Sequence, residues 1–349
     1  MSFTYFLGAN SKDGFASLYT SFPVLKGTKL HIIKGGPGCG KSSFMRRIGK
    51  EAERRGLRTE CVLCSGDPDS LDGLYIEELN QAWVDGTAPH VTEPKVFGVD
   101  ADYINLGQFV SCIDDETSRQ KLSELSSSYK ALYSSAYNYL NAAGSLRKIV
   151  LPSLLSGEEY SILRKRISGI IKRSIKERVY SLPCVRECFL SANSCDGLIR
   201  LGASIKELCK QVVEIDNRFN CASRVIELAA EEASRLDLQV IVGRSPLCPE
   251  QAEAVLIPEC SLAFIRGDWG FDKVRHIRID SLIAADLQRG YRQEIKEAKQ
   301  IEDEILCLAF EKLQQAKALH DKLEQEYRPY IDFEAVDRFF NEYISALFM

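Results

Sequence analysis

The feature that most constrains the fold of this chain is an internal repeat. FLGANSKDG at 6–14 returns as FLSANSCDG at 189–197, with seven of nine positions identical. Further along, a shift of 181 aligns more than fifty residues without a gap and pairs Ser42 with Ser223, Pro68 with Pro249 and Gly86 with Gly267. Coincidence seldom preserves both order and spacing. We therefore interpret the chain as a tandem duplication, with one copy at 1–185 and the other at 186–349.

Both copies follow the same predicted plan, an α/β segment followed by a long helical segment. In the first copy we expect a helix near 41–55 and strands near 29–34, 58–64 and 80–85. Apolar residues at three- and four-residue steps then predict helices within about 113–180 and 284–349. We expect these helices to pack as long hairpins or a short coiled coil. The simplest interpretation of their apolar stripes is a scaffold or dimer contact.

Residues 35–42, GGPGCGKS, match G-x-x-x-x-G-K-[ST] at every fixed position. Glycines adopt backbone angles closed to other residues, so the amides of such a loop can point at phosphate oxygens. The helix beginning near Lys41 adds the positive end of its dipole. The pattern predicts that Lys41 contacts the β- and γ-phosphates and that the Ser42 hydroxyl coordinates Mg²⁺. The predicted nucleotide-binding residues are Gly35, Gly36, Pro37, Gly38, Cys39, Gly40, Lys41, Ser42 and Ser43.

A phosphate loop of this kind also needs a carboxylate for the metal, usually at the end of a neighbouring apolar strand. AWVDG at 82–86 nominates Asp85 as that metal and catalytic residue, although an Asp-Gly pair is also typical of a turn. The acidic loop at 66–73 offers Asp67, Asp69 and Asp72, with a solvated turn as the simpler interpretation. His90 could reach the nucleotide or simply belong to a loop. No glutamate directly follows Asp85, so the catalytic base stays unassigned.

Composition limits the compartment and the class of partner. The 349 residues carry a net charge of −4, which gives no overall attraction for nucleic acid or anionic membranes. The first residues lack a basic leader and an apolar core, and no apolar run is long enough to span a bilayer. Twelve cysteines without a secretion signal indicate reduced thiols. We therefore expect a cytoplasmic protein.

Three stretches resemble an uncharacterised bacterial family of tandem P-loop ATPases. They are GGPGCGKSSFMRRIGKEAERRG, DPDSLDGLYIEELNQAWVDGTAPH and LHDKLEQEYRPYIDFEAVDRF. The resemblance covers nearly the whole chain, and the second and third stretches distinguish this family from other P-loop proteins. It implies an α/β P-loop NTPase fold in two repeated halves with helical additions, together with ATP binding and hydrolysis. It implies no particular substrate.

The second copy departs from the pattern of that family, in which many members carry a recognisable P-loop in both halves. The shift of 181 places DNRFNCAS at 216–223 on GGPGCGKS. Every glycine is lost, and Ala222 replaces Lys41. Without glycine the backbone cannot wrap phosphates closely, and Asp216 would repel them. We therefore expect one competent nucleotide site beside a degenerate copy.

Other motifs are weaker signals. Cys61 and Cys64 are three apart in a predicted strand, so they face opposite sides and cannot easily share a metal. Cys39 could make nucleotide binding sensitive to alkylation. The segment 164–178 carries seven basic residues beside an isoleucine face. It could pack on the core with a solvated basic side, contact a membrane or nucleic acid, or supply an arginine finger.

The sequence thus predicts an ATPase that uses ATP and Mg²⁺ at one P-loop, with slow hydrolysis by positioning and charge neutralisation. One alternative is a small-molecule kinase whose acceptor binds at the acidic loop. Another is a nucleotide-gated interaction protein whose long helices engage a partner with negligible turnover. The choice of ATP over GTP, the acceptor, the arginine finger and the oligomeric state are left open.

Overall fold

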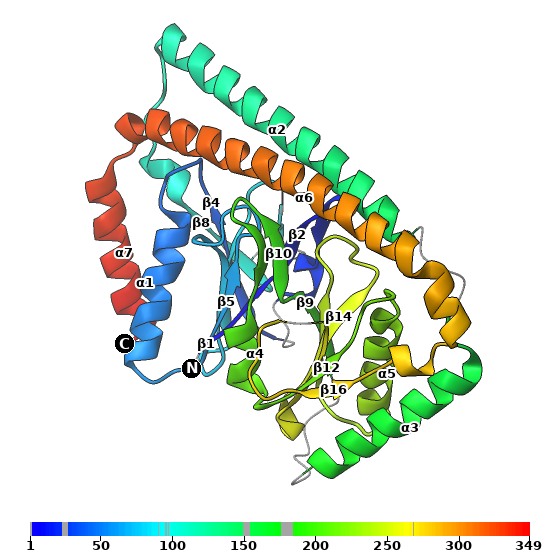
Figure 1. The fold of residues 1–349 in the computed structure, drawn as a ribbon. Coiled ribbons are helices and arrows are strands. Elements are labelled where there is room, and N and C mark those ends of the chain that lie inside the picture. Colours follow the sequence, from blue (N-terminus) through cyan, green and yellow to red (C-terminus); the bar gives the residue numbers. More distant parts are fainter. Residues whose placement is uncertain are drawn as a thin grey trace.

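The computed structural model describes residues 2–22, 27–89, 91–94, 96, 98–148, 154–175, 184–267 and 269–349. Over these residues the chain is a mixed α/β fold in which seven α-helices surround one large mixed sheet (Figure 1). None of the described helices combines the length and the apolar character that crossing a membrane requires.

Twelve of the described strands form the large sheet, in the order β16-β12-β15-β14-β13-β9-β1-β5-β6-β7-β4-β8. The first half contributes β1 (Ser2–Phe6), β4 (Lys29–Lys34), β5 (Thr59–Leu63), β6 (Leu71–Ile76), β7 (Gln81–Asp85) and β8 (Ala101–Asn105). The second half contributes β9 (Val185–Phe189), β12 (Gln211–Ile215), β13 (Val240–Arg244), β14 (Ala252–Ile257), β15 (Leu262–Arg266) and β16 (Arg275–Ile277). Two separate hairpins pair β2 (Gly8–Ser11) with β3 (Gly14–Ser17), and β10 (Ser191–Ser194) with β11 (Gly197–Arg200).

The two halves of the sheet have the same strand order when each is followed outward from the centre. There β1 and β9 meet antiparallel through Phe6 and Phe189. In each half the third strand, β6 or β14, runs antiparallel to both of its neighbours, and all other neighbours within a half are parallel. The shift of 181 found in the sequence carries β5, β6 and β7 onto β13, β14 and β15 with no offset. The strands predicted near 29–34, 58–64 and 80–85 are therefore confirmed.

A helix follows the equivalent strand of each half. α1 (Lys41–Arg54) confirms the helix predicted near 41–55 and buries Phe44, Ile48 and Ala52 on one face. Its Gly49 is buried against the sheet, where an added Cβ would lie in ordinary van der Waals contact, 3.4 Å from Leu74 Cδ1. α5 (Ala222–Ser234) buries the matching face in the second half. The remaining short helices are α4 (Gly202–Leu208) and the 3-10 turns η1 (Tyr19–Ser21), η2 (Leu106–Phe109), η3 (Pro258–Cys260), η4 (Asp280–Leu282) and η5 (Arg328–Tyr330).

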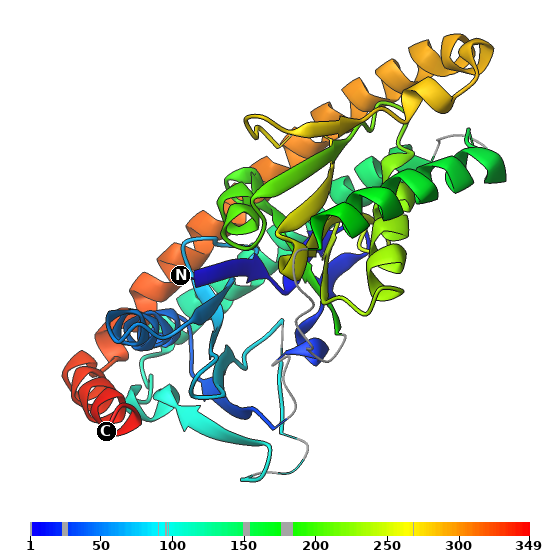
Figure 2. The same cartoon turned by 90° about the horizontal axis from the view of Figure 1, so that it is seen from below.

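The long helices pair between the halves. α2 (Glu116–Lys148) and α6 (Ala285–Tyr327) lie side by side across the sheet (Figures 1 and 2). They run antiparallel, because Lys121 pairs with Glu326 near one end and Arg147 pairs with Glu302 near the other. The expected hairpin within each half is therefore wrong for the long helices, because α2 and α6 pair across the two halves.

The last helix of each half packs on the other half. α7 (Phe333–Leu347) lies on α1, where the rings of Phe340 and Phe44 are 4.6 Å apart between centroids. α3 (Gly157–Ser174) lies on α5, at the other end of the sheet from α1 (Figures 1 and 2). The predicted copies at 1–185 and 186–349 therefore do not pack as independent units, because each completes the other with a helix.

Candidate functional site

The loop between β4 and α1 has the backbone that its glycines predict. Gly38 and Gly40 have positive φ angles of 72° and 90°, which other residues rarely adopt. Gly40 directly precedes α1, and no side chain caps this helix. The first-turn amides of a helix have no partner within the helix. They therefore stay available, beside the positive end of the helix dipole, for an anion above the loop.

Close packing explains the first glycine and the cysteine of this loop. A Cβ on Gly35 would lie 2.4 Å from Cys39 Sγ, so a side chain at position 35 would displace the thiol. Cys39 is fully buried, and burial raises the pKa of its thiol above the usual 9.0. A buried, protonated thiol reacts slowly with alkylating agents. The Cys39 side chain therefore packs under Gly35 inside the protein, and only the backbone of Cys39 can face a ligand.

The Lys41 side chain folds back onto the backbone of its own loop. Its Nζ donates to the carbonyl oxygens of Gly35 and Gly36 at 3.1 Å each, and it lies 3.7 Å from Asp85 Oδ2. Asp85 is the last residue of β7, as predicted. Its other oxygen accepts from the backbone and the hydroxyl of Thr87, which fixes the carboxylate at the strand end. The structure thus brings the predicted lysine and carboxylate together.

Ser42 and Ser43 begin α1 beside the loop. Ser42 Oγ accepts a hydrogen bond of 2.8 Å from the amide of Leu71, the first residue of β6. Ser43 is exposed on the outer side of the helix. The Ser42 hydroxyl therefore links α1 to β6, the strand that follows the acidic turn.

The acidic segment 66–73 divides between a turn and a strand. Asp67 accepts from Ser70 Oγ within a turn, and the backbone carbonyl of Asp69 accepts from Arg46. Asp72 lies on β6 and is only 6 % exposed, and its Oδ2 accepts from Tyr19 OH at 3.1 Å. The interpretation of Asp72 as part of a solvated turn is therefore wrong, because β6 draws it into the sheet. His90 lies outside the described residues.

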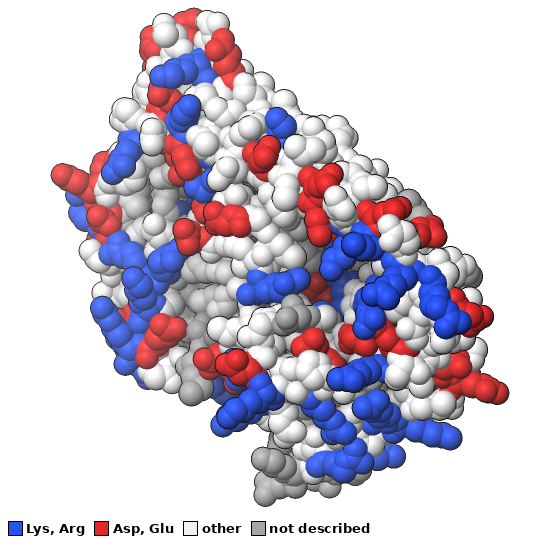
Figure 3. All heavy atoms as spheres, viewed as in Figure 1, with Lys and Arg blue, Asp and Glu red and all other residues white. Residues whose placement is uncertain are grey.

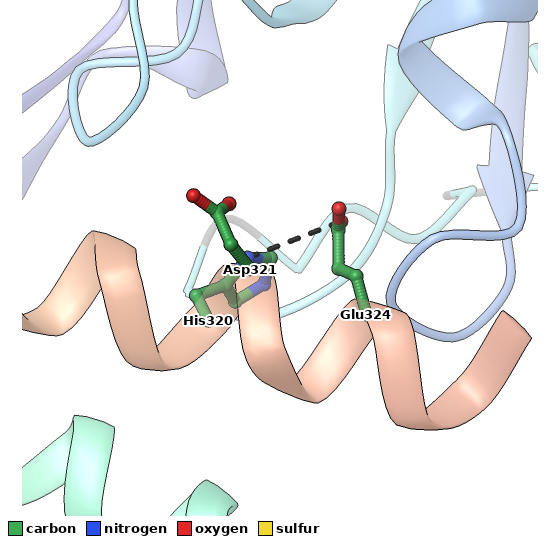
Figure 4. Close-up of side chains that lie close together, drawn as sticks. All are labelled: His320, Asp321 and Glu324. Carbon is green, nitrogen blue, oxygen red and sulfur yellow. Dashed lines mark ion pairs between the residues drawn. The ribbon is translucent and has the colours of Figure 1, made fainter.

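The site also contains a carboxylate from the second half that the sequence did not indicate. Glu324 of α6 accepts a hydrogen bond of 3.1 Å from the amide of Gly38. Figure 4 shows Asp321 and Glu324 projecting from the same side of α6, away from α2. One helical turn earlier, Lys317 pairs with Asp321 at 2.5 Å and lies 3.6 Å from Asp67. α6 therefore lies along one side of the loop at 35–42 and of the acidic turn.

The equivalent position of the second half has the opposite charge. Arg266 ends β15 where Asp85 ends β7. Its guanidinium donates to Ser223 Oγ at 3.0 Å and to Ser245 Oγ at 3.2 Å, and it lies 3.5 Å from Glu253. Burial raises the pKa of Glu253, and the nearby Arg266 opposes that rise. An internal cation thus occupies the place where the first half has a carboxylate.

The basic segment predicted at 164–178 packs against α5 over its described part. Ile167, Ile170 and Ile171 are buried, whereas Arg164 pairs with Glu231 and Glu232 of α5. Figure 3 shows basic side chains gathered over this region with acidic ones among them. A core-packed helix with a solvated basic side fits these contacts. α3 lies far from the first-half loop in Figure 1, so the described arginines of this segment cannot act as an arginine finger there.

The cysteines outside the loop form no metal-ligand cluster within the described residues, where His320, Asp321 and Glu324 are the one group that meets the spacing for a metal. None of the twelve cysteines forms a disulfide. Taken together, the loop, the uncapped helix, Lys41 and Asp85 can bind an anion with several charged oxygens and hold a cation beside it. Comparisons with family models, curated proteins and solved structures found no match for the chain.

Proposed function

We propose that the chain binds ATP with Mg²⁺ at residues 35–42 of its first half and hydrolyses it slowly. The main support is the meeting of Lys41 and Asp85 at a glycine loop that leads into an uncapped helix. Lys41 now bonds two loop carbonyls, and it would exchange them for phosphate oxygens. The loop amides would orient the phosphates, so catalysis is mainly positioning and charge neutralisation.

The metal would be held by Ser42 and Asp85. Both offer oxygen atoms, which are the ligands that Mg²⁺ prefers. When bound, Mg²⁺ neutralises charge on the β- and γ-phosphates. The remaining oxygen of Asp85 stays tied to Thr87, so its carboxylate keeps one orientation.

The proposal includes a P-loop NTPase fold duplicated in tandem, of the kind that the tandem P-loop ATPase family implies. Identical strand order and direction in the two halves support the duplication. The loss of every glycine and of the lysine at 216–223 supports a single working site. Twelve cysteines with no disulfide between them support a reducing compartment, and we propose the cytoplasm.

A second candidate function is a nucleotide-gated interaction protein. The contact between Glu324 and the loop favours it, because α6 also packs along α2 and so links the site to the long helices. A small-molecule kinase would instead place its acceptor near Asp67, beside Lys317.

The proposed ATPase is tested by phosphate release from the wild type and from Lys41→Ala, each with and without candidate acceptors. We expect the wild type to release phosphate without any added acceptor. The rate of release should fall at least about 100-fold in Lys41→Ala, because the lysine contacts the phosphate that is transferred. Release that depends on an added acceptor would favour the kinase. Equal release by both proteins would remove the site assignment.

A further inference from the structure

The Glu324 carboxylate lies where a nucleotide phosphate would bind. Its Oε1 accepts from the amide of Gly38, which is the fourth residue of the phosphate-loop motif. Loop amides of this kind donate to phosphate oxygens when a nucleotide is bound. A carboxylate oxygen is an anionic acceptor of the same type. The amide of Gly38 can therefore serve Glu324 or a phosphate, and the two anions repel each other.

The backbone of α6 is held against the loop, so only the side chain is free to leave. A Cβ on Gly38 would lie 3.4 to 3.6 Å from Cβ, O and Cα of Glu324. α2 supports the helix from the other side, through the ion pair of Lys121 with Glu326 and the ring contact of Tyr129 with His320. A nucleotide thus cannot easily push the helix aside.

The Glu324 side chain itself is weakly restrained. It is 42 % exposed, and its other polar neighbour, His320 Nδ1, is 3.9 Å away. Asp321, by contrast, is fixed by Lys317 at 2.5 Å. Rotation of the Glu324 side chain into solvent would release the amide of Gly38, while the backbone of α6 and the Lys317–Asp321 pair stay in place.

We propose that Glu324, supplied by the second half of the chain, is an autoinhibitory carboxylate that competes with nucleotide phosphates for the loop and so lowers nucleotide affinity. This inference rests on the nucleotide site proposed above. It gives the second half a role at the first-half site, because nucleotide binding and release of Glu324 from Gly38 become one event.

The test is an equilibrium titration with a fluorescent ATP analogue and Mg²⁺, using the wild type, Glu324→Gln, Glu324→Ala and Glu324→Asp. Removing a charge-assisted hydrogen bond and a like charge should tighten binding about tenfold in the Gln and Ala variants. Glu324→Asp keeps the charge but is one methylene shorter, so it loses the contact and should also bind more tightly. Glu311→Gln is the matched control, because it removes a charge from an exposed position of the same helix.

Inorganic pyrophosphate as a competitor locates the effect. It should show the same gain in affinity as the nucleotide, because the contested amide belongs to the phosphate site. A gain confined to the nucleotide, a Glu324→Asp affinity equal to the wild type, or an equal gain in Glu311→Gln would overturn the proposal.

The outcomes separate this inference from the function on which it rests. If the wild type binds and the Glu324 variants bind equally well, the competition is absent and the nucleotide site stands. If neither the wild type nor any Glu324 variant binds, the proposed function fails and the inference fails with it. Weak binding by the wild type and strong binding by Glu324→Gln would support both. Circular dichroism checks that each variant is folded, and Glu324→Gln, which preserves side-chain shape, decides the result if Glu324→Ala unfolds.

Discussion

The segments 35–42 and 216–223 occupy the same place in the two halves but differ in backbone conformation and in how the following helix begins. Each joins a parallel strand, β4 or β12, to the helix that follows. The first keeps glycines at positive φ and leaves its helix uncapped. In the second, Asn217 Oδ1 accepts from the amide of Ala222 at 3.1 Å, at the start of α5. The second segment thus binds one amide at the start of its own helix, whereas the N-cap of α1 is a glycine without a side chain to do so.

The charged residues beside the two segments also differ. The first half has Asp85, an anion suited to an external cation, and the second has Arg266, a cation built into the chain. Arg266 satisfies Ser223, which corresponds to Ser42, so no metal is needed there. Under the proposed duplication, the second half keeps the same strand order with an internal cation where the first half has the proposed metal ligand.

The largest effect that tests this comparison is expected from Arg266→Ala. Glu253 is 7 % exposed and would lose its cation, and breaking a buried pair typically costs about 3–5 kcal/mol of folding free energy. Asp85→Ala in the first half should cost about 1 kcal/mol or less, because Lys41 keeps its two carbonyl partners. Urea unfolding followed by circular dichroism measures both.

A double variant tests the stated cause. Adding Glu253→Gln to Arg266→Ala removes the unpaired charge, so it should recover part of the loss. A loss below about 1 kcal/mol in Arg266→Ala would mean that the internal cation does not stabilise the second half.

The exchanged helix α7 should contribute the next largest effect. Tyr343→Phe removes the oxygen that accepts from Trp83 Nε1 at 3.0 Å, and Trp83 is fully buried. An unsatisfied buried donor costs about 1–3 kcal/mol. Thermal unfolding should show this loss, whereas Tyr330→Phe, whose hydroxyl contacts Ser118, should have a smaller effect. Equal melting temperatures for the two variants would argue against the packing of α7 on the first half.

The backbone difference between the loops predicts unequal effects of alanine. Gly40→Ala forces a side chain into φ of 90°, with Phe340 3.5 Å from the new Cβ, and should cost about 1–2 kcal/mol. Cys221, its counterpart, already has φ of −90°, so Cys221→Ala should cost less than about 1 kcal/mol. The urea midpoints of the two variants give this comparison directly, and the reverse order would contradict the assigned loop conformations.

The smallest expected effect concerns α3 on α5. Arg164→Ala removes partly exposed ion pairs with Glu231 and Glu232, which are worth about 1 kcal/mol or less. The loss should shrink in 1 M NaCl, because salt screens such pairs. Lys165→Ala, on the exposed side of α3, is the control. A salt-independent loss would point to packing instead of charge.

Much of the first-half site could be predicted from sequence because its signals are local. The apolar run before 35–42, the glycines and the helical spacing of Phe44, Ile48 and Ala52 defined β4, the loop and α1. The strand that ends at Asp85 was equally clear. β6 was missed, because LDGLYI has an aspartate and a glycine at its second and third positions, and both are typical of a turn. In the structure it is a fully buried strand between two others.

The contacts between the halves could not be predicted in this way. An apolar stripe shows that one face of a helix is buried, but it does not show which surface buries it. The apolar stripes therefore did not show that α3 packs on the second half and α7 on the first. Glu324 lies among other charged residues of α6, and its contact with Gly38 joins residues 286 apart in the sequence. Only the assembled fold brings them together.

The central claim, one working site beside a degenerate copy, is tested most directly by the binding stoichiometry of a fluorescent ATP analogue with Mg²⁺. One site per chain is predicted for the wild type and none for Lys41→Ala, because 216–223 lacks both the glycines and the lysine. Two equivalent sites per chain, or one site that survives Lys41→Ala, would contradict it.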